Sequence, residues 1–465
     1  MEMVWHVCEL QIFYANKRYD RGNMLMYENS KKINTYVNLK TDVTKMNGKK
    51  ISILQVVVLY TFMLAIYWMN GSPISLACYL AIGVWSYFNP LLLLCLLGAS
   101  NYLPAVLGLS PLLISMGLMA VILFLHTKQF HIRYTNLDLR FIMLFIIVIW
   151  SMLSGMLQQD MSFMGSMITI FICYILLRLY LKRFEDQNRS ISYLATGIGF
   201  GIILALFIQF GISGFESFHP FRLAIGERAD PNSTGLLMAI FCVYSFVQFT
   251  NRLSEGIKNV IPYLVFVLFG LWTLLLTQSR GSILCVGIAI AIYLLFTKKK
   301  KLGNKGIITI LSVCLCVIII LIFAKDIVFG ALWDSFDQFV VRIETSSSSD
   351  GERLYLLEKS FESFVENPIF GTSLNNFELI AGHIPHNTFS DYMVTNGIVG
   401  IIFFVIMYAM PIISMHPSKR TYQLNVAYFC YFVCFLNILF YSASNEKITI
   451  ILLVILMHSI KQENY

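Results

Sequence analysis

Apolar runs of about 20 residues recur along nearly the whole chain, and they constrain the fold more than any other feature. Of the 465 residues, 57% are hydrophobic and only 13% are charged, and the mean hydropathy is +0.70. Soluble domains carry roughly a quarter charged residues. The sequence therefore predicts an all-α polytopic membrane protein with about 12–14 transmembrane helices.

The candidate spans are separated by short polar stretches. The region 74–126 is the least regular, because Asn89-Pro90 and Pro104 interrupt it and it has no charged residue. It crosses the membrane either once or three times. The full set of candidate spans is 51–69, 74–88, 91–108, 110–126, 139–157, 161–181, 190–213, 232–250, 258–277, 281–297, 306–325, 389–413, 422–441 and 446–460.

These spans divide the chain into four segments. They are a polar extension (1–50), a first set of spans (51–325), a loop (326–388) and the C-terminal spans (389–460). The stretch MNGKKISILQ, from Met46, has a short basic region followed by a span, as natural starts do. Our hypothesis is that translation begins there and that residues 1–45 are not translated. Peptides from residues 1–40 in N-terminal mass spectrometry would exclude it.

Basic loops predict the orientation, because loops rich in Lys and Arg stay in the cytoplasm. If the spans alternate, one face receives both termini and the basic loops 126–133, 181–189, 298–305 and 416–420. The opposite face receives 158–162, 214–232, 277–282 and 326–388. We therefore expect both termini to be cytoplasmic and the loop 326–388 to be extracytoplasmic.

The loop 326–388 is acidic, with ten Asp and Glu residues against two Arg and one Lys. Within it, ERLYLLEKSFESFVEN has apolar residues at spacings of three and four, which predicts an amphipathic helix lying over the bundle. These residues are Leu354, Leu357, Phe361 and Phe364. We expect TSSSSDG before this helix to be a flexible link and ENPIFGTS after it to be a turn.

Four arginines gather on the face that carries this loop: Arg222, Arg228, Arg280 and Arg353. Each has an ordinary explanation, such as snorkelling to the interface for Arg280 or a solvated loop charge for Arg228. Together, on a face otherwise short of positive charge, they suit a diphosphate, because guanidinium groups pair bidentately with phosphate oxygens.

The motif HNTFSDYMVTNGIVG places His386 just before an apolar run. Such a histidine can simply hydrogen-bond the entering chain, or its neutral imidazole can accept a proton from an attacking hydroxyl. Asn387 or Thr388 can cap the helix that follows. Gly397 and Gly400 give that helix a small-residue face that another helix can approach closely.

These motifs, in this order, resemble the O-antigen ligase and polymerase superfamily of bacterial envelope glycosyltransferases. The resemblance covers about residues 190–440. It rests on FRLAIGERADPNSTGLL (221–237), LTQSRGS (276–282), GERLYLLEKSFESFVENPIFGTSLNNF (351–377) and the His386-Asn387 pair followed after nine residues by Gly397 and Gly400.

The resemblance implies a metal-independent, cofactor-free glycan transfer from an undecaprenyl diphosphate carrier, at the outer face of the bacterial cytoplasmic membrane. By analogy, Arg222, Arg228, Arg280 and Arg353 would bind the diphosphate, with Arg280 and Arg353 also catalytic. His386 would activate the acceptor hydroxyl. The implied partners are the carrier-linked donor, a glycan or lipid-linked acceptor, membrane lipid, and flippase and chain-length regulator proteins, with no nucleic acid.

Three interpretations stay open at this point. A polymerase of O-antigen, capsule or exopolysaccharide repeat units is favoured by the divergent N-terminal half and the small loop. A ligase that transfers glycan to lipid A–core or another acceptor is favoured by the histidine motif. A flippase would show two related halves with charges at mid-membrane depth, and no such repeat is evident in the sequence.

Overall fold

The computed structural model describes residues 52–70, 72–126, 139–184, 189–209, 222–225, 230–253, 257–297, 347–385, 387–414, 422–440 and 446–463. The chain divides into two compact units, Met1–Lys50 and Ile51–Tyr465. All the described residues belong to the second unit. They form helices and one isolated β-bridge between Val106 and Leu109, and no strand occurs among them.

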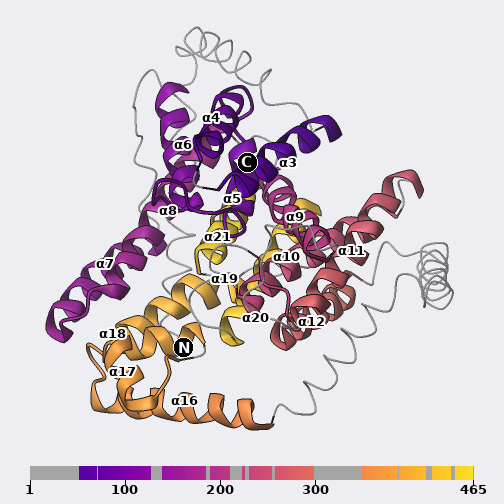
Figure 1. Cartoon of the computed structure of the whole chain (residues 1–465). Coiled ribbons are helices and arrows are strands. Elements are labelled where there is room, and N and C mark those ends of the chain that lie inside the picture. Colours follow the sequence, from indigo (N-terminus) through magenta and orange to yellow (C-terminus); the bar gives the residue numbers. More distant parts are fainter. Residues whose placement is uncertain are drawn as a thin grey trace, which may run out of the picture. The chain divides into compact units, whose positions relative to one another are not determined.

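The described helices follow one another as Figure 1 shows, and the labels are those of the figure. They are α3 (Ile53–Trp68), α4 (Pro73–Phe88), α5 (Leu92–Ala99), α6 (Pro111–His126), α7 (Leu139–Gln158), α8 (Ser162–Phe184), α9 (Ser190–Gln209), α10 (Pro231–Asn251), α11 (Ile257–Thr277), α12 (Arg280–Thr297), α16 (Ser347–Glu366), α17 (Leu374–Ala381), α18 (Thr388–Phe404), the π-helix η1 (Val405–Ala409), α19 (Met410–Ser414), α20 (Tyr422–Phe440) and α21 (Glu446–Glu463).

The length and apolar character of these helices confirm the predicted fold class. Six of the described segments are long and apolar enough to cross a membrane, and six shorter helices are also apolar. The protein is thus an all-α, multi-pass membrane protein. The expected span 306–325 lies outside the described residues.

Helix α10 lies at the centre of the bundle. It packs against α9, α11, α12 and α20, and nearly every residue from Thr234 to Phe249 is buried. Its first turn is fixed by Asp230, whose carboxylate accepts hydrogen bonds from the backbone amides of Asn232 and Ser233. The residues that follow Asp230 therefore start the helix at a defined point.

The prediction of a continuous helix over 91–108 is wrong. Only Leu92–Ala99 is helical, and all eight of these residues are buried. Part of the nonhelical chain beyond α5 also lies inside the protein, with Tyr102, Leu103 and Val106 buried and Leu107 and Leu109 exposed. Nonhelical backbone is tolerated at membrane depth where protein surrounds it.

Close contact with α9 explains why α5 lies buried at this position in the bundle. A Cβ atom at Gly98 would overlap the carbonyl oxygen of Leu194, and one at Gly197 would overlap that of Cys95. Two glycines therefore let the backbones of α5 and α9 touch, as small residues do between membrane helices. A hydropathy pattern does not report this contact.

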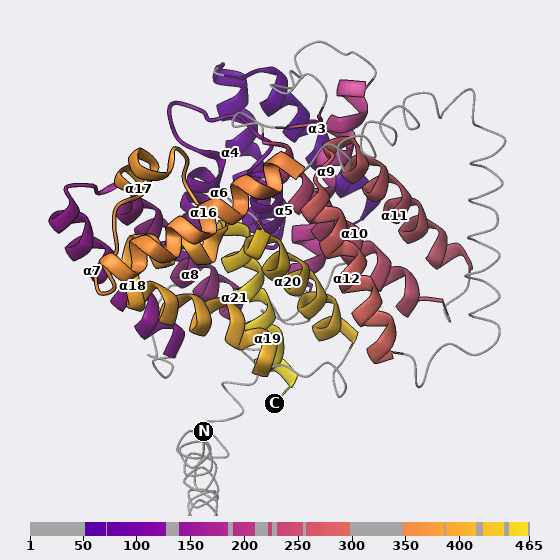
Figure 2. The same ribbon diagram turned by 90° about the horizontal axis from the view of Figure 1, so that it is seen from below.

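Helix α16 lies across one face of the bundle beside α17 and α18 (Figures 1 and 2). It begins at Ser347, so the expectation of a flexible link over TSSSSDG is wrong for its Ser347–Gly351 part. The predicted turn after the helix is confirmed, with Gly371 at φ +71°. We call the face that carries α16 the α16 side.

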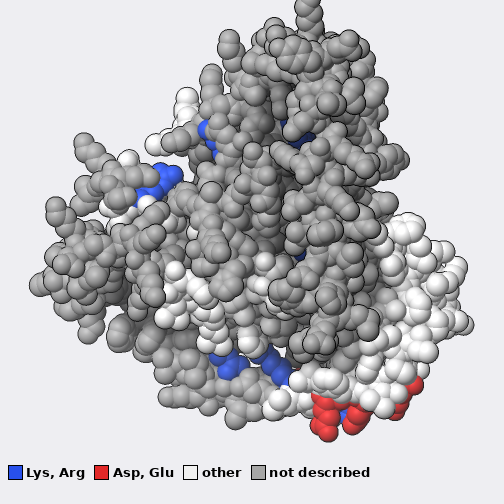
Figure 3. Space-filling model, turned by 180° about the vertical axis from the view of Figure 1, so that it is seen from behind, with Lys and Arg blue, Asp and Glu red and all other residues white. Residues whose placement is uncertain are grey.

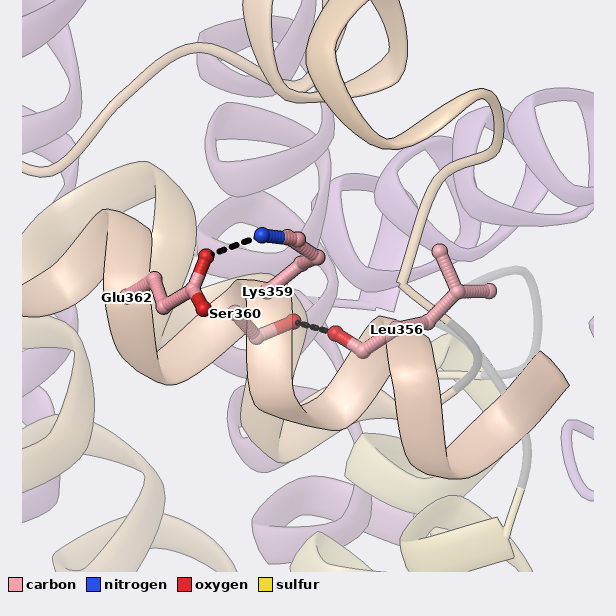
Figure 4. Close-up of polar contacts among 4 residues, drawn as sticks. All are labelled: Leu356, Lys359, Ser360 and Glu362. Carbon is pink, nitrogen blue, oxygen red and sulfur yellow. Dashed lines mark hydrogen bonds and ion pairs between the residues drawn. The ribbon is translucent and has the colours of Figure 1, made fainter. Parts of the chain in front are cut away.

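The side of α16 that packs inward differs from the predicted apolar stripe. Leu356, Ser360 and Ser363 are buried, whereas Leu354 is 69% exposed and Phe361 is 48% exposed. The Ser360 hydroxyl donates to the Leu356 carbonyl, 2.7 Å away (Figure 4). The Ser363 hydroxyl donates to the Thr372 hydroxyl in the turn that follows. Small side chains at these positions allow the helix to approach its neighbours closely.

The contact between α5 and α9 gives a test of the fold. We expect Gly197→Ala to lower the thermal midpoint in detergent, because overpacking costs about 1–3 kcal/mol. Gly117→Ala on α6 is the matched control, since nothing lies within 4 Å of the added methyl group. Its midpoint should be unchanged or slightly higher. Equal midpoints for the two variants would contradict this packing.

Candidate functional site

The α11–α12 corner, Thr277–Arg280, is a tight break between two helices. Gln278 has a left-handed backbone with φ +51°, and its amide donates to the Leu275 carbonyl. The Thr277 hydroxyl donates to the Leu274 carbonyl and accepts from the Ser279 amide. Thr277, Gln278 and Ser279 are buried, and Arg280 begins α12 in a half-buried position.

Arg222 joins this corner to α10. Its Nε donates to the Thr277 carbonyl at 3.1 Å, and its terminal nitrogen donates to Asn232 Oδ1 at 3.1 Å. The next residue, Leu223, donates its amide to the Leu276 carbonyl. Arg222 therefore supports the end of α11, where helix carbonyls have no partner within the helix.

A row of polar side chains continues from Asn232 into the bundle. Ser279 Oγ lies 3.3 Å from Asn232 Oδ1 and 3.0 Å from Ser282 Oγ, and Ser282 Oγ donates to Asn437 Oδ1 at 2.8 Å. Asn437 comes from α20 and is buried. The row thus connects the starts of α10 and α12 with α20.

Beside this row lies a small cavity that is partly open to solvent. Its lining includes Asn232, Ser279, Ser282 and Asn437 from the bundle and Arg353 from α16. Arg353 is exposed, and no described residue forms a hydrogen bond or ion pair with its guanidinium group. A cation thus faces a cavity with one polar wall at the first turn of α12, where the helix dipole also favours an anion.

Charge on the α16 side is mixed. Figure 3 shows Asp and Glu side chains gathered along the lower edge, where α16 lies in Figure 1, with Lys and Arg side chains beside them. On α16 itself, Lys359 is paired with Glu362 (Figure 4). This hydrogen bond raises the pKa of Lys359 above its ordinary value. The positive charge of Lys359 is thus offset by the carboxylate of Glu362, whereas no described carboxylate pairs with Arg353.

The segment after His386 forms a broken helix. Asn387 caps α18 by accepting a hydrogen bond from the Ser390 amide at 2.7 Å. At Gly397 the backbone leaves the helical conformation, with φ +57° and ψ −139°. The close approach at Gly397 comes from the backbone of Pro368 and Ile369, which form a turn rather than a helix. A Cβ at Gly400 would overlap the Tyr392 carbonyl of the same segment.

Side chains of α7 satisfy the carbonyls that this break leaves without helical partners. Trp150 Nε1 donates to the Asn396 carbonyl at 3.2 Å, and Ser154 Oγ donates to the Thr395 carbonyl at 3.0 Å. Ser151 Oγ donates to Asn396 Oδ1. A small cavity lined partly by polar side chains remains beside these groups. The polar side chains of α7 thus stabilise the break.

The structure brings part of the predicted site together. Arg222, Arg280 and Arg353 lie at or beside the α11–α12 corner and its cavity, although Arg280 itself does not line the cavity. Arg228 and His386 lie outside the described residues. Sequence reasoning did not single out Asn437, for which the signal was an amide side chain within an apolar run.

The fold and the site together define a class of protein. It is a multi-pass membrane protein with an arginine-bearing cavity at one end of its helix bundle. Residues 264–405 match a family model described as O-antigen ligase, and no curated protein matches the chain. The match confirms the resemblance to the O-antigen ligase and polymerase superfamily. That family indicates glycan transfer of the ligase or polymerase type, and hence a glycosyltransferase-like activity.

The matched region covers less than half of the chain, including Arg280, Arg353, His386, Asn387, Gly397 and Gly400. Arg222, Asn232 and Asn437 lie outside it. The cavity therefore combines residues of the matched region with residues of helices on either side.

Asn232 gives a test of the site architecture. Asn232→Ala removes the acceptor for Arg222 and Ser279, and a hydrogen bond to a charged group contributes about 1.5–3 kcal/mol. We expect a lower thermal midpoint in detergent, measured by intrinsic fluorescence. Asn232→Asp keeps the acceptor oxygen and should not lower it. The exposed Asn375→Ala is the control, and an Asn232→Ala midpoint equal to that of the control would contradict the role of Asn232.

Proposed function

We propose that the protein transfers a glycan from an undecaprenyl-diphosphate-linked donor on the extracytoplasmic face of the bacterial cytoplasmic membrane. The acceptor we favour is a carrier-linked repeat unit, so that the protein polymerises a surface polysaccharide. The observation that carries the proposal is the cavity between Arg353 and the α11–α12 corner. The basic loops predicted on the other face support this orientation.

In the proposed reaction, the acceptor hydroxyl attacks the anomeric carbon of the donor sugar. The bond from that carbon to the diphosphate oxygen breaks, and undecaprenyl diphosphate leaves with the electron pair. His386, as neutral imidazole, takes the hydroxyl proton. The reaction is proposed to be metal-independent, with arginines offsetting the charge that develops on the leaving group.

The arginines differ in the roles that their contacts support. Arg222 already donates to Thr277 and Asn232, so part of its role is to hold the corner. Arg353 faces the cavity from α16 and is the arginine best placed to bind the diphosphate. Arg280 and Arg228 complete the proposed cation set.

A deletion strain complemented with single variants tests this function. Arg353→Ala and His386→Ala should each reduce the surface glycan product about 100-fold or more at unchanged membrane abundance. Lys359→Ala is the matched control, because it removes a cation from the same helix that pairs with Glu362 rather than facing the cavity. It should keep the wild-type product. The surface glycan and the carrier-linked pool are displayed side by side on gels.

The product pattern distinguishes the interpretations. Single repeat units on the final surface acceptor, with long chains absent, support the polymerase. Long chains retained on the carrier, with none on the acceptor, support the ligase instead. Repeat units trapped on the cytoplasmic side would indicate a flippase and contradict the proposal. A wild-type ladder from well-expressed Arg353→Ala would contradict the site.

A further inference from the structure

The segment between α16 and α18 has apolar side chains that no described part of the protein covers. Leu379 is 84% exposed and Ile380 is 66% exposed, and Ile369 and Ile384 are exposed as well. The opposite side of α17 is packed, because buried Phe377 lies against Leu356 and Val394. Helix α17 therefore has a protein-facing apolar side and a second, uncovered one.

Contacts with α7 fix the depth of this segment. Ser154 Oγ donates to the Phe370 carbonyl at 2.7 Å, and Gln158 Nε2 donates to the carbonyls of Phe370 and Gly371. The Trp150 ring stacks on the Phe370 ring at 4.8 Å. The turn before α17 therefore lies beside the last turns of α7, as Figure 1 shows for α17 and α18.

The same turns of α7 expose apolar side chains to the surroundings. Met152, Leu153, Met156 and Leu157 are all exposed, and α7 is a 20-residue helix that is apolar enough to span a membrane. Exposed apolar residues of such a helix face lipid. The Phe370 turn thus lies level with these exposed apolar residues of α7.

Three carbonyl groups of the turn meet the condition for that depth. Carbonyl groups at lipid depth need partners within the protein. The Pro368 carbonyl accepts from the Ile398 amide at 2.8 Å, and the carbonyls of Phe370 and Gly371 accept from α7. Ile398 and Ile402 of α18, next to this turn, are exposed apolar residues too.

We propose that the segment Asn367–Pro385 inserts into the membrane leaflet on the α16 side, with Ile369, Leu379, Ile380 and Ile384 in contact with lipid. The occupant of the uncovered apolar surface is therefore lipid, because that surface continues the lipid-facing side of α7. Glu378 and His383, which are exposed, lie at the polar boundary of the leaflet. The insertion anchors α16 and the start of α18 at a fixed depth, independently of the proposed chemistry.

Labelling of one introduced cysteine at a time, in the full chain in nanodiscs, tests the insertion. Leu379→Cys, Ile380→Cys and Ile384→Cys are each labelled with the fluorophore NBD, and the wild-type signal is subtracted as background. We expect lipids brominated on their acyl chains to quench each label several-fold more than aqueous iodide does. Glu378→Cys is the matched control on the same helix, where iodide should be the stronger quencher.

Two outcomes would overturn the proposal. Labels at Leu379 and Ile380 that iodide quenches as strongly as the label at Glu378 would show that α17 stands in water. Labels shielded from both quenchers would show that protein covers the surface. Size-exclusion profiles in detergent confirm that each labelled variant is folded, and Ile384→Cys provides an independent position if one α17 variant fails.

Discussion

Every backbone amide and carbonyl at membrane depth must find a partner within the protein, and breaks in helices make this hardest. The described helices meet the requirement in different ways. Beyond α5, the Tyr102 amide donates to the Ala99 carbonyl, and Val106 and Leu109 exchange backbone hydrogen bonds. At Gly397, side chains of α7 donate hydrogen bonds to the carbonyls that the helix break leaves without partners. At the α11–α12 corner, Arg222 and the Thr277 hydroxyl do so.

The corner connects this requirement with function. Arg222, Asn232 and Ser279 form hydrogen bonds that hold two helix ends and the start of α10 together. The same row leads to Ser282 and Asn437 and forms one wall of the cavity that Arg353 faces. A polar wall at the end of an apolar bundle is thus a consequence of how the helices end, and the ligand that we propose for it is an anionic headgroup.

The local hydropathy pattern predicted helices well where polar residues flank an apolar run. The expected spans 258–277 and 281–297 correspond to Ile257–Thr277 and Arg280–Thr297, because TQSRGS and the lysine run 298–301 bound them. The expected helix over 91–108 ends at Ala99, ahead of Pro104, which cannot continue a helix. The close backbone contact at Gly98 and Gly197 joins segments far apart in sequence, so the local pattern does not report it.

Prediction of the site was limited in a similar way. The arginine motifs could be found from the sequence, and Arg222, Arg280 and Arg353 lie at or beside one cavity. The inward side of α16 could not be found from the sequence. The spacing of apolar residues favours Leu354 and Phe361, whereas the packing buries Leu356, Ser360 and Ser363. Asn437 gains a role only through Ser282, a partner on another helix. The roles of all four arginines and of His386 stay predictions.

The most direct test of the central claim is ligand binding to the wild-type protein in nanodiscs. A short-chain polyprenyl diphosphate, the matching monophosphate and the matching alcohol are compared at low salt by native mass spectrometry. If the cavity binds the diphosphate, affinity should fall at least tenfold from diphosphate to alcohol, about 1.4 kcal/mol or more, and inorganic pyrophosphate should compete. Equal affinity for the three lipids, without competition, would mean that only the apolar tail is recognised and would contradict the account.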